Sequence, residues 1–267
     1  MSEYDVIVVG GGNAAFCAAL AAQEQGAKVV MLEAAPEDEA GGNSRFTAGS
    51  IRVVYNGVDD IKTLVPDLTQ AEIDTTDFGT YTAEQFFDDM ARVTQHRADP
   101  DLVELLVTKS FDTLNWMREK GVRFIPIYGR QAFKIEGKFK FWGGLTVESV
   151  GGGPGLVNML TEAAKKRGIE VRYRTRALDL ITDGDRVTGV RIRHDGQVSE
   201  LQSKAVVLAS GGFQPTRNGA RAISAPAGIS PRCAGRASTT ATASAWPWIS
   251  APAQAATGPA AMPCNGK

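Results

Sequence analysis

The sequence has few of the residues that build metal sites or disulfide frameworks, and it lacks long hydrophobic runs. Its 267 residues include three cysteines, and Cys17, Cys233 and Cys264 form no CxxC pair. A zinc site and a disulfide framework are therefore disfavoured. No apolar run approaches the roughly 20 residues of a membrane-spanning helix. The chain opens without a basic segment before an apolar run, which argues against a signal peptide. We therefore expect a cytoplasmic protein.

The chain also has little net charge and few histidines. The formal charge is -1 at pH 7, so no nucleic-acid partner is implied. The two histidines, His96 and His194, have no neighbouring ligands in the sequence and are interpreted as solvated surface residues. Cys17 lies in an alanine-rich helical run and is interpreted as a small buried apolar residue. A hydrophobic content of 43% is typical of a globular protein, which leaves an ordinary folded enzyme as the expectation.

The first 33 residues contain a complete strand–helix–strand unit. Residues 4–9 are apolar and β-branched, which predicts a buried parallel strand. Three glycines interrupt the run at 10–12, and small residues over 13–25 predict a helix that Gly26 ends. A second buried strand is predicted over 27–33. This order defines a βαβ unit.

The remaining pattern predicts an α/β, Rossmann-like domain over residues 1–213, with a parallel sheet, an antiparallel meander and inserted helices at about 60–150. Helices are predicted over 82–97, 100–120 and from the glycine turn at 151–155 to about 167. Short strands near 169–175, 177–182, 187–193 and 197–202 read as the meander, and a separate buried strand is predicted at 205–209.

The turn after the first strand fits a dinucleotide-binding motif. Gly10 permits a tight turn, Gly12 lets backbone N–H groups approach a pyrophosphate, and Ala15 keeps the helix close to the sheet. The helix that begins at Asn13 and Ala14 offers free N–H groups to the phosphates. Glu33 ends the second strand, where a carboxylate accepts the ribose hydroxyls of adenosine and disfavours a 2′-phosphate.

Two later glycine segments favour FAD over NAD. Gly41-Gly42-Asn43-Ser44 follows Glu33 after a short loop, and Ser210-Gly211-Gly212 follows the predicted last strand. A simple NAD-dependent dehydrogenase needs neither segment, although each could also be an ordinary loop turn. Two alternatives stay open: an NAD-dependent dehydrogenase, and a chain that binds FAD without catalysing a reaction.

Together with Gly151 to Leu156, these segments resemble the succinate dehydrogenase/fumarate reductase flavoprotein family over residues 1–213. The resemblance implies an FAD-dependent oxidoreductase that acts on a CH–CH bond of a small polycarboxylate, and it is closest to members that oxidise tricarballylate to cis-aconitate. A flavoprotein similar to fumarate reductase or succinate dehydrogenase is the alternative that the resemblance leaves open. It further implies a membrane-bound iron–sulfur electron acceptor. The cofactor-site residues assigned are Gly10, Gly12, Asn13, Ala14, Ala15, Glu33, Gly41, Gly42, Asn43, Ser44, Ala177, Ser210 and Gly211.

The chain also departs from the family pattern. Ala40 stands where a basic residue commonly precedes the glycine pair, and residues 41–60 contain no histidine for a covalent flavin link. We therefore expect non-covalent FAD. The family's catalytic arginine lies beyond the resemblance, so no catalytic residue is assigned.

A few further side chains are candidates for substrate or core roles. Arg45 and Arg52 could bind a substrate carboxylate, or could be surface charges. The aromatic residues Phe133, Phe139, Phe141 and Trp142 are interpreted as core rather than as a substrate box.

The composition changes after residue 213. Residues 214–267 hold 7 of the 12 prolines and no Asp, Glu, Leu or Val, so we expect this segment to be disordered and the substrate-capping domain to be missing. Tryptophan has the single codon TGG, so the base before Pro247 and the base before Ile249 are both G. In the frame that starts at this base, Trp246 and Pro247 give GCC, which encodes Ala, and Trp248 and Ile249 give GAT, which encodes Asp. We expect a frameshifted tail and an inactive 267-residue chain.

Overall fold

The computed structural model describes residues 3–141 and 143–212. They form two compact units, one from residues 3–46 and 160–212 and the other from Thr47–Met159. The expectations for Trp142 and for residues 214–267 lie outside the described residues. None of the helices in the described part is long and apolar enough to cross a membrane.

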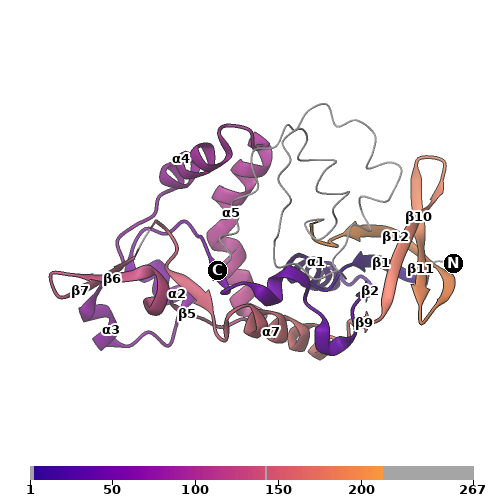
Figure 1. The fold of residues 1–267 in the computed structure, drawn as a ribbon, viewed down its shortest axis with the longest axis horizontal. Coiled ribbons are helices and arrows are strands. Elements are labelled where there is room, and N and C mark those ends of the chain that lie inside the picture. The colour runs from indigo at the N-terminus through magenta and orange to yellow at the C-terminus, as the bar shows by residue number, and fades with distance from the viewer. Residues whose placement is uncertain (1–2, 142, 213–267) are drawn as a thin grey trace, which may run out of the picture. The chain divides into compact units, whose positions relative to one another are not determined.

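The first unit is built on a six-stranded mixed sheet with the order β10-β11-β12-β1-β2-β9 (Figure 1). Strands β12, β1, β2 and β9 run parallel to their neighbours, whereas β10, β11 and β12 form an antiparallel meander. The predicted α/β fold with a parallel sheet and a meander is confirmed. The strands are β1 Tyr4–Val9, β2 Val29–Leu32, β9 Glu170–Arg172, β10 Thr175–Asp183, β11 Arg186–His194 and β12 Gln197–Leu208.

Strand β12 corrects the expectation of a separate last strand. Its residues 197–202 pair antiparallel with β11, and its residues from Ser203 onward pair in parallel with β1. Gln202, Ser203 and Lys204 include neither glycine nor proline, so nothing in the sequence breaks the strand between its two partners. Strand β9 also differs from the expectation, because it pairs with β2 and not with the meander.

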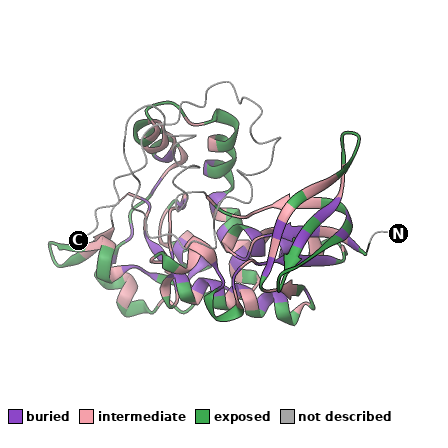
Figure 2. Cartoon of the chain, turned by 45° about the vertical axis from the view of Figure 1, so that its right-hand side comes forward, coloured by how far each residue is buried: buried purple, intermediate pink, exposed green. Residues whose placement is uncertain are grey.

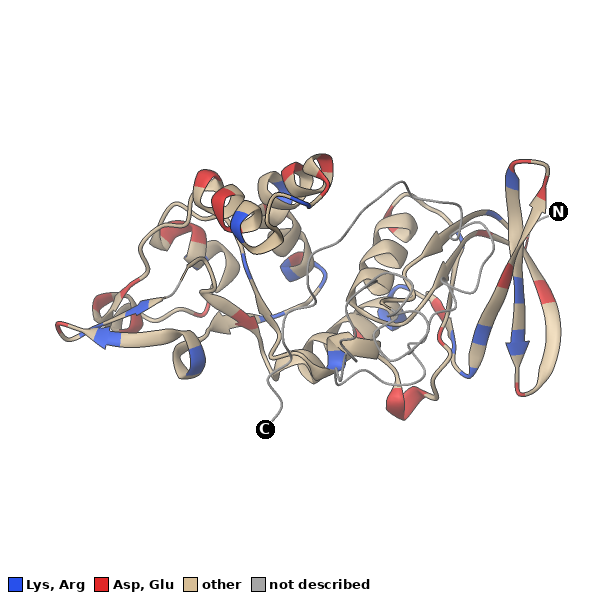
Figure 3. Ribbon diagram, turned by 45° about the horizontal axis from the view of Figure 1, so that its top comes forward, with Lys and Arg blue, Asp and Glu red and all other residues tan. Residues whose placement is uncertain are grey.

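The meander carries charged side chains of both signs (Figure 3). Arg191 on β11 lies 3.7 Å from Asp179 on β10 and 3.3 Å from Glu200 on β12. These pairs are half exposed and contribute little each. They show that this face of the meander is solvated, while the opposite face packs into the core.

Helix α1 (Asn13–Glu24) covers the parallel strands. Its buried residues Ala15, Phe16, Ala19 and Leu20 lie on one face, as helical periodicity requires. Because two of these four residues are alanines, the helix can approach the sheet closely at those positions. A further core cluster joins the parallel strands to the meander: Tyr4, Ile7, Val9, Val30, Leu32, Ala177, Val190, Ile192 and Leu201. Figure 2 colours the chain by burial, with the buried residues in purple.

The second unit holds the inserted helices and two small three-stranded sheets, β3-β8-β5 and β4-β7-β6. Its helices are α2 Val58–Leu64, α3 Gln70–Thr75, α4 Ala83–Thr94, α5 Pro100–Glu119 and α6 Tyr128–Gln131, and α7 Gly152–Lys166 begins in it. Its strands are β3 Ser50–Ile51, β4 Thr76–Asp77, β5 Phe124–Pro126, β6 Ala132–Ile135, β7 Lys138–Phe141 and β8 Val147–Ser149.

The aromatic residues of this unit divide between core and surface. Phe141 stacks on the buried Phe78 with ring centroids 5.6 Å apart, and Phe139 packs on Tyr128. Phe133 is 42% exposed on strand β6, so its assignment to the core is wrong. It belongs to a two-stranded ribbon at the edge of a small sheet, where one face meets solvent.

Candidate functional site

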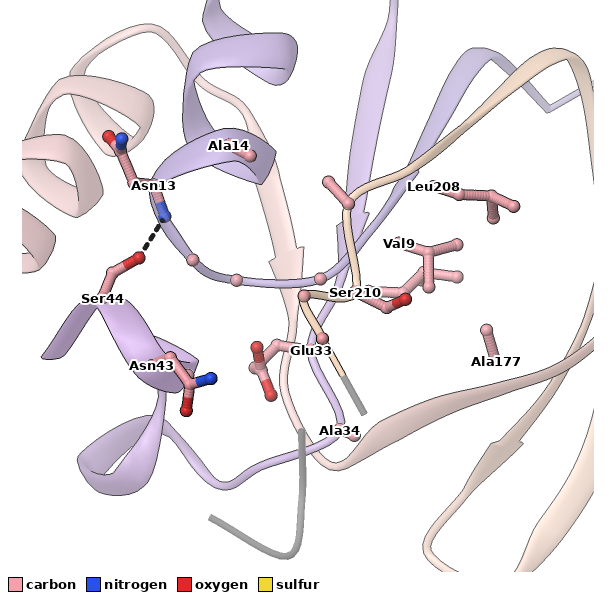
Figure 4. Close-up of a pocket in the computed structure, with 18 of the residues that line it drawn as sticks. Val9, Asn13, Ala14, Glu33, Ala34, Asn43, Ser44, Ala177, Leu208 and Ser210 are labelled. Atoms are coloured by element: carbon pink, nitrogen blue, oxygen red, sulfur yellow. Dashed lines mark hydrogen bonds between the residues drawn. The ribbon is translucent and has the colours of Figure 1, made fainter. Parts of the chain in front are cut away.

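The described part of the first unit contains a cavity of ≈ 390 Å³ where the parallel strands end. Val9, Leu32 and Leu208 are the last residues of β1, β2 and β12, and all three line it. In open parallel sheets, ligands bind at this edge of the strands. Figure 4 shows the labelled lining residues around this space. The other lining residues are Gly10, Gly11, Gly12, Asn13, Ala14, Glu33, Ala34, Gly42, Asn43, Ser44, Thr175, Ala177, Ala209, Ser210, Gly211 and Gly212.

The turn between β1 and α1 brings the backbone close to its neighbours. Gly10 has a φ of +126°, which side-chain-bearing residues rarely adopt, and a Cβ there would lie 2.3 Å from the Ala209 carbonyl oxygen. A Cβ on Gly12 would lie 3.3 Å from Ser44 Oγ. Residues 10–12 therefore form a turn without side chains, open to a ligand on the cavity side.

A hydroxyl from a distant segment caps helix α1. Gly12 is the N-cap and offers no side-chain acceptor, but the Asn13 N–H donates to Ser44 Oγ at 3.0 Å (Figure 4). Ser44 lies in the 3₁₀ helix η2 (Gly42–Phe46), directly after the second glycine pair. This bond joins the first and second glycine motifs at the helix end where N–H groups and the helix dipole favour an anion.

Glu33 is the charged group of the cavity. Its side chain is 7% exposed, and one carboxylate oxygen accepts the Ala35 N–H at 2.7 Å. Burial raises the pKa of Glu33 above its usual value, while hydrogen bonds from the Ala35, Ala34 and Gly11 N–H groups and the charge of Arg176 oppose that shift. The carboxylate is thus held by backbone donors beside the glycine turn, where it can accept further hydrogen bonds.

The structure brings the assigned cofactor-site residues together in this cavity, except Ala15 and Gly41. Ala15 is fully buried on the sheet-facing side of α1, where its small size serves packing. Thr175 was not singled out in the sequence, because its place depends on how β10 lies beside β2. Gly11 was passed over as the variable position of the motif.

The two candidate arginines already have partners within their own units. Arg45 Nη1 donates to the Ala40 carbonyl at 3.1 Å. Arg52 Nη1 forms a 2.9 Å ion pair with Asp89 and donates to the Tyr81 hydroxyl at 3.0 Å. Arg52 therefore acts as a structural tie within the second unit, so a role in carboxylate binding gains no support.

Both histidines are exposed, as expected. His96 follows the end of α4 in a left-handed conformation with a φ of +58°. His194 ends β11, and its Nδ1 lies 2.9 Å from Thr175 Oγ1. Among the described residues, no group of His, Cys, Asp and Glu side chains is arranged to hold a metal ion.

The residues present fit a dinucleotide. The turn leaves room that a Cβ would fill, the end of α1 points N–H groups at the space, and Glu33 is placed for a ribose. The fold and site therefore define a dinucleotide-binding α/β domain. The FAD-binding domain family model matches residues 5–266, and the chain belongs to that family.

Similar proteins include a fumarate reductase and a urocanate reductase. The chain is 30% identical over 212 residues to "Fumarate reductase (cytochrome)" of Shewanella frigidimarina, a match that covers 78% of this chain and 33% of that protein. It is 28% identical over 228 residues to "Urocanate reductase" of Eggerthella lenta, covering 79% of this chain and 32% of that protein. The chain thus spans about a third of the length of the curated relatives it matches.

Solved structures agree on the fold. The open conformation of a flavocytochrome c3 fumarate reductase superposes with a TM-score of 0.62 at 28% identity, covering 80% of this chain and 35% of that chain. A 3-ketosteroid-Δ4-(5α)-dehydrogenase from Rhodococcus jostii superposes with a TM-score of 0.63 at 23% identity, covering 83% of this chain and 48% of that chain.

Proposed function

We propose that this chain supplies the FAD-holding part of an oxidoreductase that acts on a carbon–carbon bond, in the manner of a fumarate reductase. The observation that carries the proposal is the cavity in which the glycine turn, the α1 N-terminus and the Glu33 carboxylate converge. Bound FAD would supply hydride transfer to or from carbon. The chain's own residues hold and orient it.

Each group has a distinct task in this proposal. The glycine turn and the N-terminal end of α1, beyond the Asn13 N–H that Ser44 holds, bind the pyrophosphate. Glu33 accepts the ribose hydroxyls of the adenosine half. Ser44, which holds the Asn13 N–H, keeps η2 against the helix end, so that both glycine motifs contact one cofactor.

The substrate class rests on the relatives. Their names point to fumarate, urocanate and acrylate, which all carry a C=C bond conjugated to a carboxylate. These names support a fumarate-reductase-like reaction better than oxidation of tricarballylate to cis-aconitate, which stays a narrower proposal. A membrane-bound iron–sulfur electron acceptor is likewise a proposal.

The test separates cofactor binding from turnover. FAD should bind the purified 267-residue chain with a dissociation constant that titration of its fluorescence can measure, and NAD should not compete. Fumarate reduction with a reduced viologen dye and tricarballylate oxidation with an artificial acceptor would then be assayed. We expect binding without turnover by this chain; displacement of FAD by NAD would instead support a nicotinamide-dependent enzyme.

A further inference from the structure

We propose that Gly11 is a positioning residue for cofactor binding, acting through Glu33: the missing side chain at Gly11 leaves the space in which the Glu33 carboxylate is held. This inference rests on the proposed function, because it explains how the ribose-binding carboxylate reaches its place. It concerns the middle glycine of the turn, to which the dinucleotide motif assigns no role.

The three glycines of the turn have three different reasons to be glycine. Gly10 has a left-handed φ and lies against the Ala209 backbone. Gly12 faces Ser44, whose Oγ would lie 3.3 Å from an added Cβ. Gly11 is absent from the glycines with a left-handed φ, so no positive φ disfavours a side chain at this position. Backbone freedom therefore does not explain the glycine at this position.

The surroundings of Gly11 give the explanation. A Cβ there would lie 2.4 Å from Glu33 Oε2 and 3.1 Å from both Cδ and Cγ of the same side chain. The three nearest heavy atoms thus all belong to Glu33. A methyl group could be accommodated only if the carboxylate moved, because the end of this side chain is more flexible than the backbone around it.

Movement of the carboxylate would break its present anchorage. One oxygen accepts the Ala35 N–H at 2.7 Å, and the Gly11 N–H also hydrogen bonds to the carboxylate. Glu33 is buried at the wall of the cavity, so a displaced carboxylate must leave these donors and turn toward the space that the ribose would occupy. The expected result of a methyl at this position is a misplaced acceptor in a folded chain.

A double-mutant cycle tests the claim with FAD titrations of the wild type, Gly11→Ala, Glu33→Ala and the double variant. Gly11→Ala should raise the dissociation constant about tenfold, since it disturbs a charged acceptor. In the Glu33→Ala background the added methyl meets no carboxylate, so the double variant should match Glu33→Ala within about twofold. A tenfold loss that persists without Glu33 would overturn the proposal.

A control variant and an NMR titration further test the positioning role of Gly11. Gly129→Ala is the matched control, because Gly129 has an ordinary φ and nothing within 4 Å of the added Cβ, and its FAD affinity should equal that of the wild type. In the cofactor-free chain, NMR titration should show the pKa of Glu33 lower in Gly11→Ala than in the wild type, since burial is the largest influence on this pKa and outweighs the N–H donors that the displaced carboxylate loses. An unchanged pKa would refute the positioning role. Absence of FAD binding by the wild type would instead contradict the proposed function, and the titration would still decide the role of Gly11.

Discussion

Among the residues described around the cavity, Glu33 carries the charged side chain, and its removal should affect the cofactor strongly. We expect Glu33→Ala to weaken FAD binding by about 10–150-fold, which corresponds to roughly 1.5–3 kcal/mol for hydrogen bonds to a charged acceptor. Fluorescence titration measures the change. Glu37→Ala is the matched control, because Glu37 is an exposed carboxylate four residues further on. Equal affinities for Glu33→Ala and wild type would show that Glu33 does not reach the ribose.

The burial of Glu33 also predicts a pH dependence of stability. Its pKa is raised by burial, so the folded chain takes up this proton at higher pH than the unfolded chain. The group's contribution to stability is therefore present below its unfolded pKa and lost as pH rises through the folded value. Cofactor-free Glu33→Gln, which cannot ionise, should gain stability relative to wild type as the pH rises from about 4, near the unfolded pKa of a glutamate, towards neutral. Urea unfolding across that range measures the difference; a difference that does not change with pH would contradict the prediction.

At the scale of elements, the end of helix α1 depends on a hydroxyl that is remote in sequence. Ser44→Ala removes the acceptor of the Asn13 N–H and should lower the free energy of unfolding by about 1 kcal/mol, as the loss of a helix cap does. Urea denaturation gives the value. Ser199→Ala, at an exposed position of β12, should leave it unchanged. A Ser44 variant as stable as the Ser199 variant would show that water replaces the cap without cost.

The sequence predicted elements well where their ends carry chemical signals. Helix α5 begins at Pro100, and the side chain of its N-cap Asp99 accepts the N–H groups of Asp101 and Leu102. Helix α3 was missed, although Thr69 and Glu72 form a capping box there, because it has only six residues and no apolar period. The continuity of β12 was missed because its sequence changes from the mostly polar residues 197–204 to the apolar run 205–208, which suggested two separate strands.

The candidate site likewise contains residues that the sequence predicted and residues that it did not. Gly10, Gly12 and residues 42–44 could be placed at the cavity from motif spacing alone, because local backbone geometry decides their position. Thr175 and Gly11 could not, because their roles depend on contacts with residues that are distant in the sequence.

For the whole molecule, we predict that FAD is held without a covalent bond. Residues 41–60 offer no histidine to the flavin. Acid precipitation of the reconstituted protein should therefore leave the yellow flavin in the supernatant. Flavin that remains with the precipitated protein would contradict the prediction.

The out-of-frame interpretation of residues 214–267 stays a prediction. The family match extends to residue 266, whereas the match to the Shewanella fumarate reductase covers 78% of the chain. Sequencing of the coding DNA through codon 214 tests it: the alternative frame should encode a segment similar to these relatives. An uninterrupted frame with no such segment would show that the composition change is native.

Strand β12 pairs with β11 along its first half and with β1 along its second half, and this arrangement affects the order of folding. Its first half joins β11 across the tight turn at Asp195 and Gly196, so this hairpin closes a short loop. Its second half pairs with β1, about two hundred residues earlier in the chain. Because the entropy of loop closure and the folding rate both depend on that separation, the meander should form early and β1 should join it late. The β1–β12 pairing, and with it the glycine turn, would then show low φ-values in a mutational study of the folding transition state.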